Sequence, residues 1–217
     1  MAVHIDLSHS IVDAMTTYPG LPGPVIGTHL SRDAAETVYG PGVTFHIGMI
    51  EICTNTGTYL DVPFHRFAAG HDLTALDLNR VAAVPAVCLD RRGERSIDLD
   101  PSELSGVSGH AVLIRTGHSR YFGQPEYGQE HPFLTAASAE ALVAAGVACV
   151  GIDSLNIDGT DDLERPVHTA LLGADIPIIE HLTGLAPLPK EGFTFTAVPP
   201  KIAGAGTFTV RAYATIP

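Results

Sequence analysis

Two side chains with catalytic potential, Asp61 and His65, lie four residues apart on either side of Pro63. Pro63 restricts the backbone, so the carboxylate and the imidazole are carried by a stiff segment rather than by a mobile loop. A carboxylate and an imidazole at this spacing are suited to hold a metal ion or to work as an acid/base pair. Taken alone, the spacing equally fits a capped turn with a surface histidine.

A second pair of this kind, His168 and Glu180, lies about a hundred residues further along the chain. Pro166 is predicted to open a short helix that carries His168, and a strand over 176–180 is predicted to end at Glu180. A helix, turn and strand in this order can fold back and bring the two side chains together. Viewed alone, Glu180 also fits a strand-end carboxylate that faces water.

The two pairs together resemble the cyclase family, which includes the bacterial kynurenine formamidases. Its signature is His-x-Gly-Thr-His-x-Asp-x-Pro-x-His, and the corresponding stretch here runs from Asn55 to His65. The matching residues are Gly57, Thr58, Asp61, Pro63 and His65, together with the distal pair His168 and Glu180. The two leading histidines of the signature are replaced, by Asn55 and Tyr59.

The resemblance implies a metal site made by Asp61, His168 and Glu180, with His65 as the acid/base. Oxygen and nitrogen donors of this kind suit one divalent ion, Zn²⁺ or Mn²⁺. A second ion is not expected, because it would depend on Asn55 and Tyr59. An amide oxygen is a poor ligand beside imidazole, and a phenol must first lose a proton of pKa about 10.

The predicted chemistry is hydrolysis of a carbon–nitrogen bond in a small amide or formamide, aromatic ones included. An arylformamidase of tryptophan catabolism is the type of enzyme that the resemblance implies. His65 would move the proton of a metal-activated water, and Tyr59 would donate a hydrogen bond to the developing oxyanion. Asn55, Phe64 and His118 are the candidates for contacts with the substrate.

Two other functions remain open at this point. One is a metal-free cyclase or lyase in which Tyr59 and His65 move protons. The other is a non-catalytic protein that binds a small molecule on the same scaffold, an alternative that rests on the two replaced histidines.

The hydrophobic pattern predicts one α/β domain over residues 1–217, with a mixed sheet and few helices. The resemblance implies the swivelling β/β/α fold of the cyclase family. Strands are predicted at 3–7, 43–52 (with one face buried), 83–89, 110–116, 147–152, 176–180, 193–198 and 207–214. Helices are predicted at 76–81, after Asp100, at 135–146 and at 166–172, and residues 13–42 are predicted to form an extended loop.

Several other polar residues fit structural roles better than catalytic ones. The acidic run from Asp153 to Asp162 does not have the spacing of a calcium loop and is expected to be solvated. Surface or capped positions are expected for most of the scattered histidines, which are His46, His71, His110, His118 and His131, and His118 is the best candidate among them for a pocket residue. The three cysteines are predicted to be reduced, buried thiols: Cys53, Cys88 and Cys149.

Composition narrows the class of protein further. A net charge of −12 over 217 residues argues against nucleic-acid binding. No apolar run approaches the roughly 20 residues that cross a membrane, and the N-terminus lacks the pattern of a secretion signal, so a cytoplasmic protein is expected. The apolar, Pro/Gly-rich segment 15–42 predicts a homodimer or larger homo-oligomer.

Overall fold

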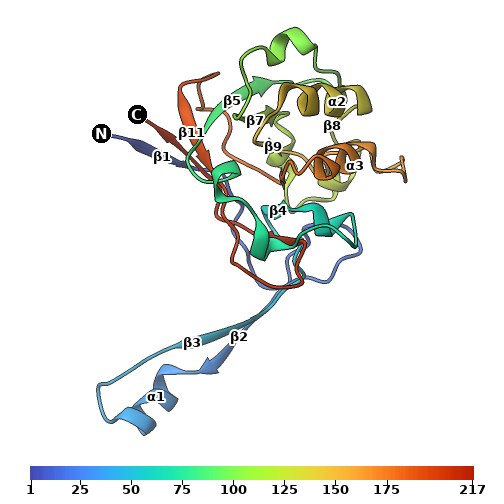
Figure 1. The fold of residues 1–217 in the computed structure, drawn as a ribbon. Helices are drawn as coiled ribbons and strands as arrows, with labels where there is room; N and C mark the ends of the chain where they lie inside the picture. The colour runs from blue at the N-terminus through green and yellow to red at the C-terminus, as the bar shows by residue number, and fades with distance from the viewer.

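A nine-stranded mixed sheet runs through the protein and includes strands from both ends of the chain (Figure 1). The computed structural model describes all 217 residues. The strands of the sheet are β1 (Val3–Asp6), β4 (Tyr59–Asp61), β5 (Val84–Asp90), β7 (Ala111–Arg115), β9 (Cys149–Ile152), β10 (Ile178–Glu180), β11 (Phe193–Thr196), β12 (Thr207–Thr209) and β13 (Tyr213–Ile216). Their order is β1-β13-β11-β5-β7-β9-β10-β4-β12, and only β5, β7, β9 and β10 are parallel neighbours.

The remaining elements are short. Two further strand pairs are β2 (Val25–Leu30) with β3 (Ile47–Glu51), and β6 (Ser96–Ile97) with β8 (Phe133–Leu134). The α-helices are α1 (Arg32–Tyr39), α2 (Ala136–Ala145) and α3 (Pro166–Gly173). Single 3₁₀ turns lie at Pro63–His65, Leu73–Ala75, Leu78–Arg80, Pro101–Leu104, His118–Tyr121 and Pro125–Gly128. A single domain with a mixed sheet and few helices is therefore confirmed.

The central strands are apolar on both faces because both faces are covered. Along β7, Val112 and Ile114 pack into the cluster that lies under α2 and α3, while Ala111 and Leu113 face the opposite cluster. This alternation follows from the two-residue period of a strand. Helix α2 begins at the cap residue Thr135, whose side chain accepts a hydrogen bond from the Ser138 N–H, and ends at a left-handed glycine, as its sequence predicts.

Strand β4 lies between two partners that come from the far end of the chain. In β10, Glu180 stands opposite Tyr59 and Ile178 opposite Asp61. On the other side, Thr207 of β12 stands opposite Asp61. Side chains directly across an antiparallel pair are close neighbours. The sheet order therefore brings Glu180 and Thr207 next to the strand that carries Tyr59 and Asp61.

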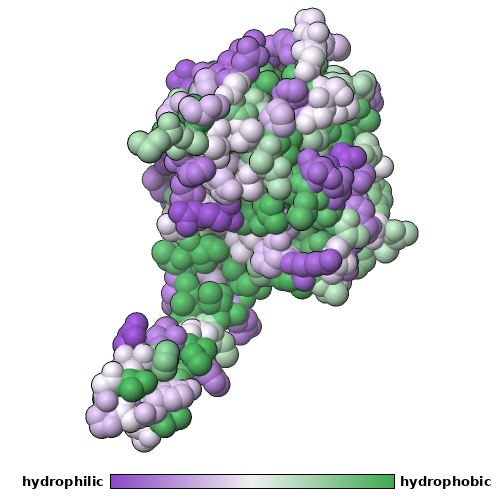
Figure 2. Space-filling model, turned by 60° about the vertical axis from the view of Figure 1, so that its left-hand side comes forward, coloured by the Kyte–Doolittle hydropathy of each residue, from purple (hydrophilic) through white to green (hydrophobic).

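The middle of the segment between β1 and β4 projects from the body as an arm formed by β2, α1 and β3 (Figure 1). The prediction of a loop over 13–42 is wrong, because β2 and α1 lie within it. The prediction of one buried face on 43–52 is also wrong, because all five residues of β3 are exposed. Strand β3 pairs only with β2, away from the body, so neither of its faces reaches a core. Apolar side chains gather along the arm and at its base (Figure 2).

Three other expectations need correction. The last predicted strand is divided: β12 pairs with β4, while β13 pairs with β11 and β1. The expectation of a solvated acidic run is wrong for Asp153 and Asp158, which are buried and accept backbone hydrogen bonds. His131 is buried rather than on the surface, and its Nε2 bonds the Asp158 carbonyl.

The cysteines are unpaired, as predicted; Cys88 and Cys149 are buried and Cys53 is half-buried. No helix is long and apolar enough to cross a membrane.

Candidate active site and metal site

Asp61 is a fully buried carboxylate at the end of β4. Its Oδ1 accepts a hydrogen bond from the Thr207 hydroxyl, whereas Oδ2 is buried and has no hydrogen-bond partner. Burial raises the pKa of Asp61, but the charges of His65 and His168 and the hydrogen bond from Thr207 outweigh it and lower the pKa below its usual value. A buried, ionised oxygen without a partner is costly unless a cation or donor occupies the space in front of it.

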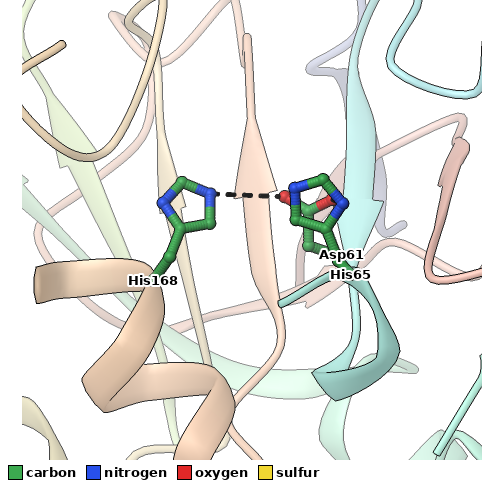
Figure 3. Close-up of side chains that lie close together, drawn as sticks. All are labelled: Asp61, His65 and His168. Atoms are coloured by element: carbon green, nitrogen blue, oxygen red, sulfur yellow. Dashed lines mark ion pairs between the residues drawn. The ribbon is translucent and has the colours of Figure 1, made fainter. Parts of the chain in front are cut away.

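His168 faces that oxygen from the first turn of α3 (Figure 3). Its Nδ1 lies 2.6 Å from Asp158 Oδ2, so Nδ1–H donates and Nε2 points away from Asp158. Asp158 also accepts the backbone N–H groups of Val167 and His168, at 2.7 and 3.0 Å. One carboxylate therefore caps the helix and orients the imidazole.

Glu180, at the end of β10, completes a set of three donors. His168 Nε2 lies 3.8 Å from Asp61 Oδ2 and 3.8 Å from Glu180 Oε1. Glu180 is buried rather than facing water. Its Oε1 accepts the Ile157 N–H, and its Oε2 accepts the Tyr59 hydroxyl, each at 2.6 Å.

Two separations within this set suit a divalent cation, those from His168 Nε2 to Asp61 and to Glu180. Donors around tetrahedral zinc lie about 3.4 Å apart, given bonds of about 2.1 Å, and the separations of 3.8 Å are close to this value. Burial lowers the pKa of His168, but its hydrogen bond to Asp158 and the charges of Glu180 and Asp61 outweigh it and raise the pKa to about 10. Positive charge is therefore favoured at this point, and an ion would replace the proton on Nε2.

Distance alone groups a different set, Asp61, His65 and His168, whose donor atoms lie within 4.8 Å of one another. The Nδ1 atom of His65 lies 2.8 Å from the Thr207 oxygen. Since the Thr207 hydroxyl gives its one proton to Asp61, its oxygen accepts from His65 Nδ1–H. Hydrogen bonding therefore commits His65 Nδ1 to Thr207, so only Nε2 of this ring could act as a donor to an ion.

The same hydrogen bond leaves His65 Nε2 as a basic nitrogen with a free lone pair. His65 lies on the turn after Pro63 and its side chain is 35% exposed, so a substrate and water can reach it. Neither Thr207 nor Asp158 was identified from the sequence. Asp158 sits in an acidic run that reads as a solvated loop, and Thr207 has no motif around it.

Tyr59 is buried beside Glu180, and its hydroxyl proton is donated to that carboxylate. Burial and the charges of Glu180 and Asp61 hold the pKa of Tyr59 well above its usual value, while the Asn55 side chain opposes this rise. Tyr59 is therefore a neutral donor rather than a phenolate ligand or a base. His181, also missed from the sequence, is fully buried beside it, and burial lowers the pKa of His181 to about 3.

The predicted substrate contacts lie in different places. Phe64 is exposed on the turn next to His65, and Asn55 is half-buried near Tyr59. His118 lines a separate polar cleft with Arg95 and Arg120, where its Nε2 bonds the Tyr127 carbonyl. The geometry thus places Phe64 beside the acid/base and His118 apart from it.

A family model described as putative cyclase matches residues 5–159. The chain belongs to the cyclase family. Kynurenine formamidases from Salinibacter ruber and Bacillus cytotoxicus are each 29% identical to it, covering 96% of this chain and 95% of the relative. The family model ends before His168 and Glu180, whereas these two relatives align over nearly the whole chain.

Solved structures agree on the fold. Isatin hydrolase A from Ralstonia solanacearum superposes with a TM-score of 0.83 at 22% identity, over all of this chain and 92% of the other. A potential metal-dependent hydrolase with cyclase activity gives 0.81 at 24% identity, over 100% and 99% of the two chains. The swivelling fold expected for a cyclase-family member is confirmed.

Replacing Asp158 by Ala should weaken metal binding about 10- to 100-fold, because His168 would lose the partner that orients its ring. Titration with Zn²⁺ or Mn²⁺ followed by calorimetry measures this loss. Glu164→Ala, an exposed carboxylate in the preceding loop, is the matched control. Wild-type affinity in Asp158→Ala would show that Asp158 serves only the helix.

Proposed function

We propose that this protein is a metal-dependent hydrolase of a carbon–nitrogen bond in a small amide or formamide, similar in activity to the kynurenine formamidases. The observation that carries the proposal is the unpartnered Oδ2 of Asp61, which faces His168 Nε2. Support comes from the relatives, which are named kynurenine formamidase, and from structural neighbours named isatin hydrolase. Both names describe hydrolysis at carbon–nitrogen bonds.

One divalent ion would be held by Asp61, His168 and Glu180. Bound there, it would supply a water of lowered pKa and polarise the substrate carbonyl. A second ion has no place in this proposal, since the neutral hydroxyl of Tyr59 points to Glu180 where the family signature has a histidine.

The protein's own groups then move the proton. His65 Nε2 accepts a proton from the attacking water as its oxygen bonds to the carbonyl carbon. Thr207 and Asp61 hold the other ring nitrogen and stabilise the positive charge that His65 acquires. His65 returns the proton to the nitrogen as the carbon–nitrogen bond breaks, giving a carboxylic acid and an amine.

Tyr59 contributes differently from the sequence-based prediction. Its only proton is used by Glu180, so we assign it to the support of a ligand rather than to the oxyanion. A role for Tyr59 as a mobile proton carrier in a metal-free lyase fits poorly with its raised pKa.

Turnover of N-formylkynurenine and of isatin, with and without a chelator, tests the proposed reaction. We expect hydrolysis of at least one of them by protein loaded with Zn²⁺ or Mn²⁺, and loss of the activity on dialysis against chelator. Activity should return when the ion is restored. Equal turnover before and after chelation would contradict metal dependence, and binding without turnover would favour the non-catalytic alternative.

Replacing His65 by Ala should lower kcat by about 10²- to 10⁴-fold, the usual contribution of a general acid/base. Metal affinity should stay near that of the wild type, because His65 is not among the proposed ligands. His110→Ala, a half-buried histidine that bonds the Ser108 carbonyl, is the control. A loss of less than about tenfold in His65→Ala would remove its assigned role.

A homodimer or larger assembly is proposed from the arm. Its exposed apolar side chains are Val25, Ile26, Val38, Tyr39, Val43, Phe45, Ile47, Met49 and Ile50. A two-stranded hairpin is marginally stable by itself, and an apolar patch of this kind marks a protein interface. The resemblance implies a family that assembles through this segment, so the partner we propose is a second copy of the chain.

Replacing Ile47 and Met49 together by Asp should yield a monomer of 22.8 kDa, whereas wild type should give a multiple of that mass in light scattering. Both side chains are exposed and lie on one face of β3, so the body of the protein should keep its fold. His29→Asp, a polar and exposed position on β2, is the control. A monomeric wild type would refute the assembly.

A further inference from the structure

Four buried side chains form a continuous line of hydrogen bonds that ends at Glu180. Tyr127, on the turn Pro125–Gly128, places its hydroxyl 2.8 Å from His181 Nδ1. His181 Nε2 lies 3.3 Å from the Tyr59 hydroxyl, which lies 2.6 Å from Glu180 Oε2. None of the four is more than 3% exposed.

The donor in each of these bonds can be assigned by counting protons. Tyr59 has a single hydroxyl proton and donates it to Glu180 Oε2. The Tyr59 oxygen then accepts from His181, which places the ring proton of His181 on Nε2. Its Nδ1 is consequently the acceptor, and Tyr127 donates to it. Every bond points from Tyr127 toward Glu180.

The backbone holds His181 in place firmly. Its φ of 55° lies in the left-handed region, which histidine adopts less readily than glycine. The His181 carbonyl accepts the Thr58 hydroxyl at 2.6 Å, and its N–H donates to the Ser154 carbonyl at 3.3 Å. The ring cannot turn away without breaking a buried network.

Tyr127 is held from the other side by aromatic rings. His118 stacks on it with 5.1 Å between centroids, and Phe122 meets it edge-on at 5.2 Å. This packing accounts for His118 better than contact with a substrate does. The loop 118–128 is thereby connected to the strand that carries Glu180.

We propose that Tyr127 and His181 are positioning residues that act through Tyr59 to hold Glu180 in its orientation toward the metal ion. The inference rests on the proposed metal-dependent function. Tyr59 and the Ile157 N–H each engage one oxygen of Glu180, so the carboxylate cannot rotate, and Oε1 keeps a lone pair directed toward His168. This support acts through the tyrosine that stands in place of a signature histidine.

The test measures the affinity for Zn²⁺ by calorimetry in four variants of the full chain. In Tyr59→Phe the affinity for Zn²⁺ should fall about 10- to 100-fold, because the variant lacks the hydrogen bond to the proposed ligand Glu180. In Tyr127→Phe the affinity for Zn²⁺ should fall about fivefold, which corresponds to the loss of one hydrogen bond. The double variant should match Tyr59→Phe, because Tyr127 acts only through Tyr59. Tyr121→Phe, whose hydroxyl accepts from the Arg120 side chain in the same loop, should match wild type.

An affinity for Zn²⁺ in Tyr127→Phe equal to that of wild type would overturn the inference. A double variant that binds Zn²⁺ about fivefold more weakly than Tyr59→Phe would also overturn it, because Tyr127 would then act without Tyr59. His168→Ala separates this failure from failure of the proposed function. If wild type binds the ion and His168→Ala does not, only the inference is lost. If neither binds it, both are overturned.

A second measurement needs neither metal nor activity. In ¹⁵N-histidine NMR spectra, His181 should appear as the neutral ring with its proton on Nε2, and its Nδ1 signal should move in Tyr127→Phe. His181→Asn identifies the signal. A proton on Nδ1, or an unchanged signal in Tyr127→Phe, would contradict the assigned direction of the bonds even if one variant folds poorly.

Discussion

The ionised carboxylate of Asp61, which has no exposed surface, is the constraint on which the site depends. A buried charge is retained only where hydrogen bonds and opposite charge compensate the loss of water. Thr207 provides the hydrogen bond on one oxygen, and His168 faces the other. Strand β4 lies between β10 and β12 in the sheet, and this position makes both compensations possible.

Two carboxylates, Asp158 and Glu180, extend this arrangement into the surrounding structure. Asp158 fixes the His168 ring from behind while it caps α3, so helix formation and ligand orientation depend on one side chain. Glu180 is fixed by a backbone N–H and by Tyr59. Supports of this kind determine how well a ligand set is organised for its ion.

The departures from the family signature make a consistent pattern. Tyr59 stands where the signature has a histidine, and its bond to Glu180 begins a hydrogen-bond network that continues to His181 and Tyr127. The arm differs from the body in its surface, because its apolar side chains are exposed in the single chain. The candidate site draws its residues from distant parts of the chain, while the arm exposes apolar side chains.

The sequence by itself determined the family and the mixed α/β fold, and its resemblance to the cyclase family pointed to Asp61, His65, His168 and Glu180 as candidate site residues. The helices and strands follow from local information, because helix caps and apolar periodicity act within a few residues. The cap at Thr135 and the apolar strands around β7 were predicted for that reason.

Only the tertiary structure decided the partners of those residues. Thr207 meets His65 across 142 positions, and Tyr59 meets His181 across 122, so no local pattern records either contact. Burial of Asp158 and exposure of β3 likewise depend on what packs against them rather than on their own residue types. Strand order and register are set by long-range pairing. This pairing brings together the side chains whose hydrogen bonds fix the proton positions in the site.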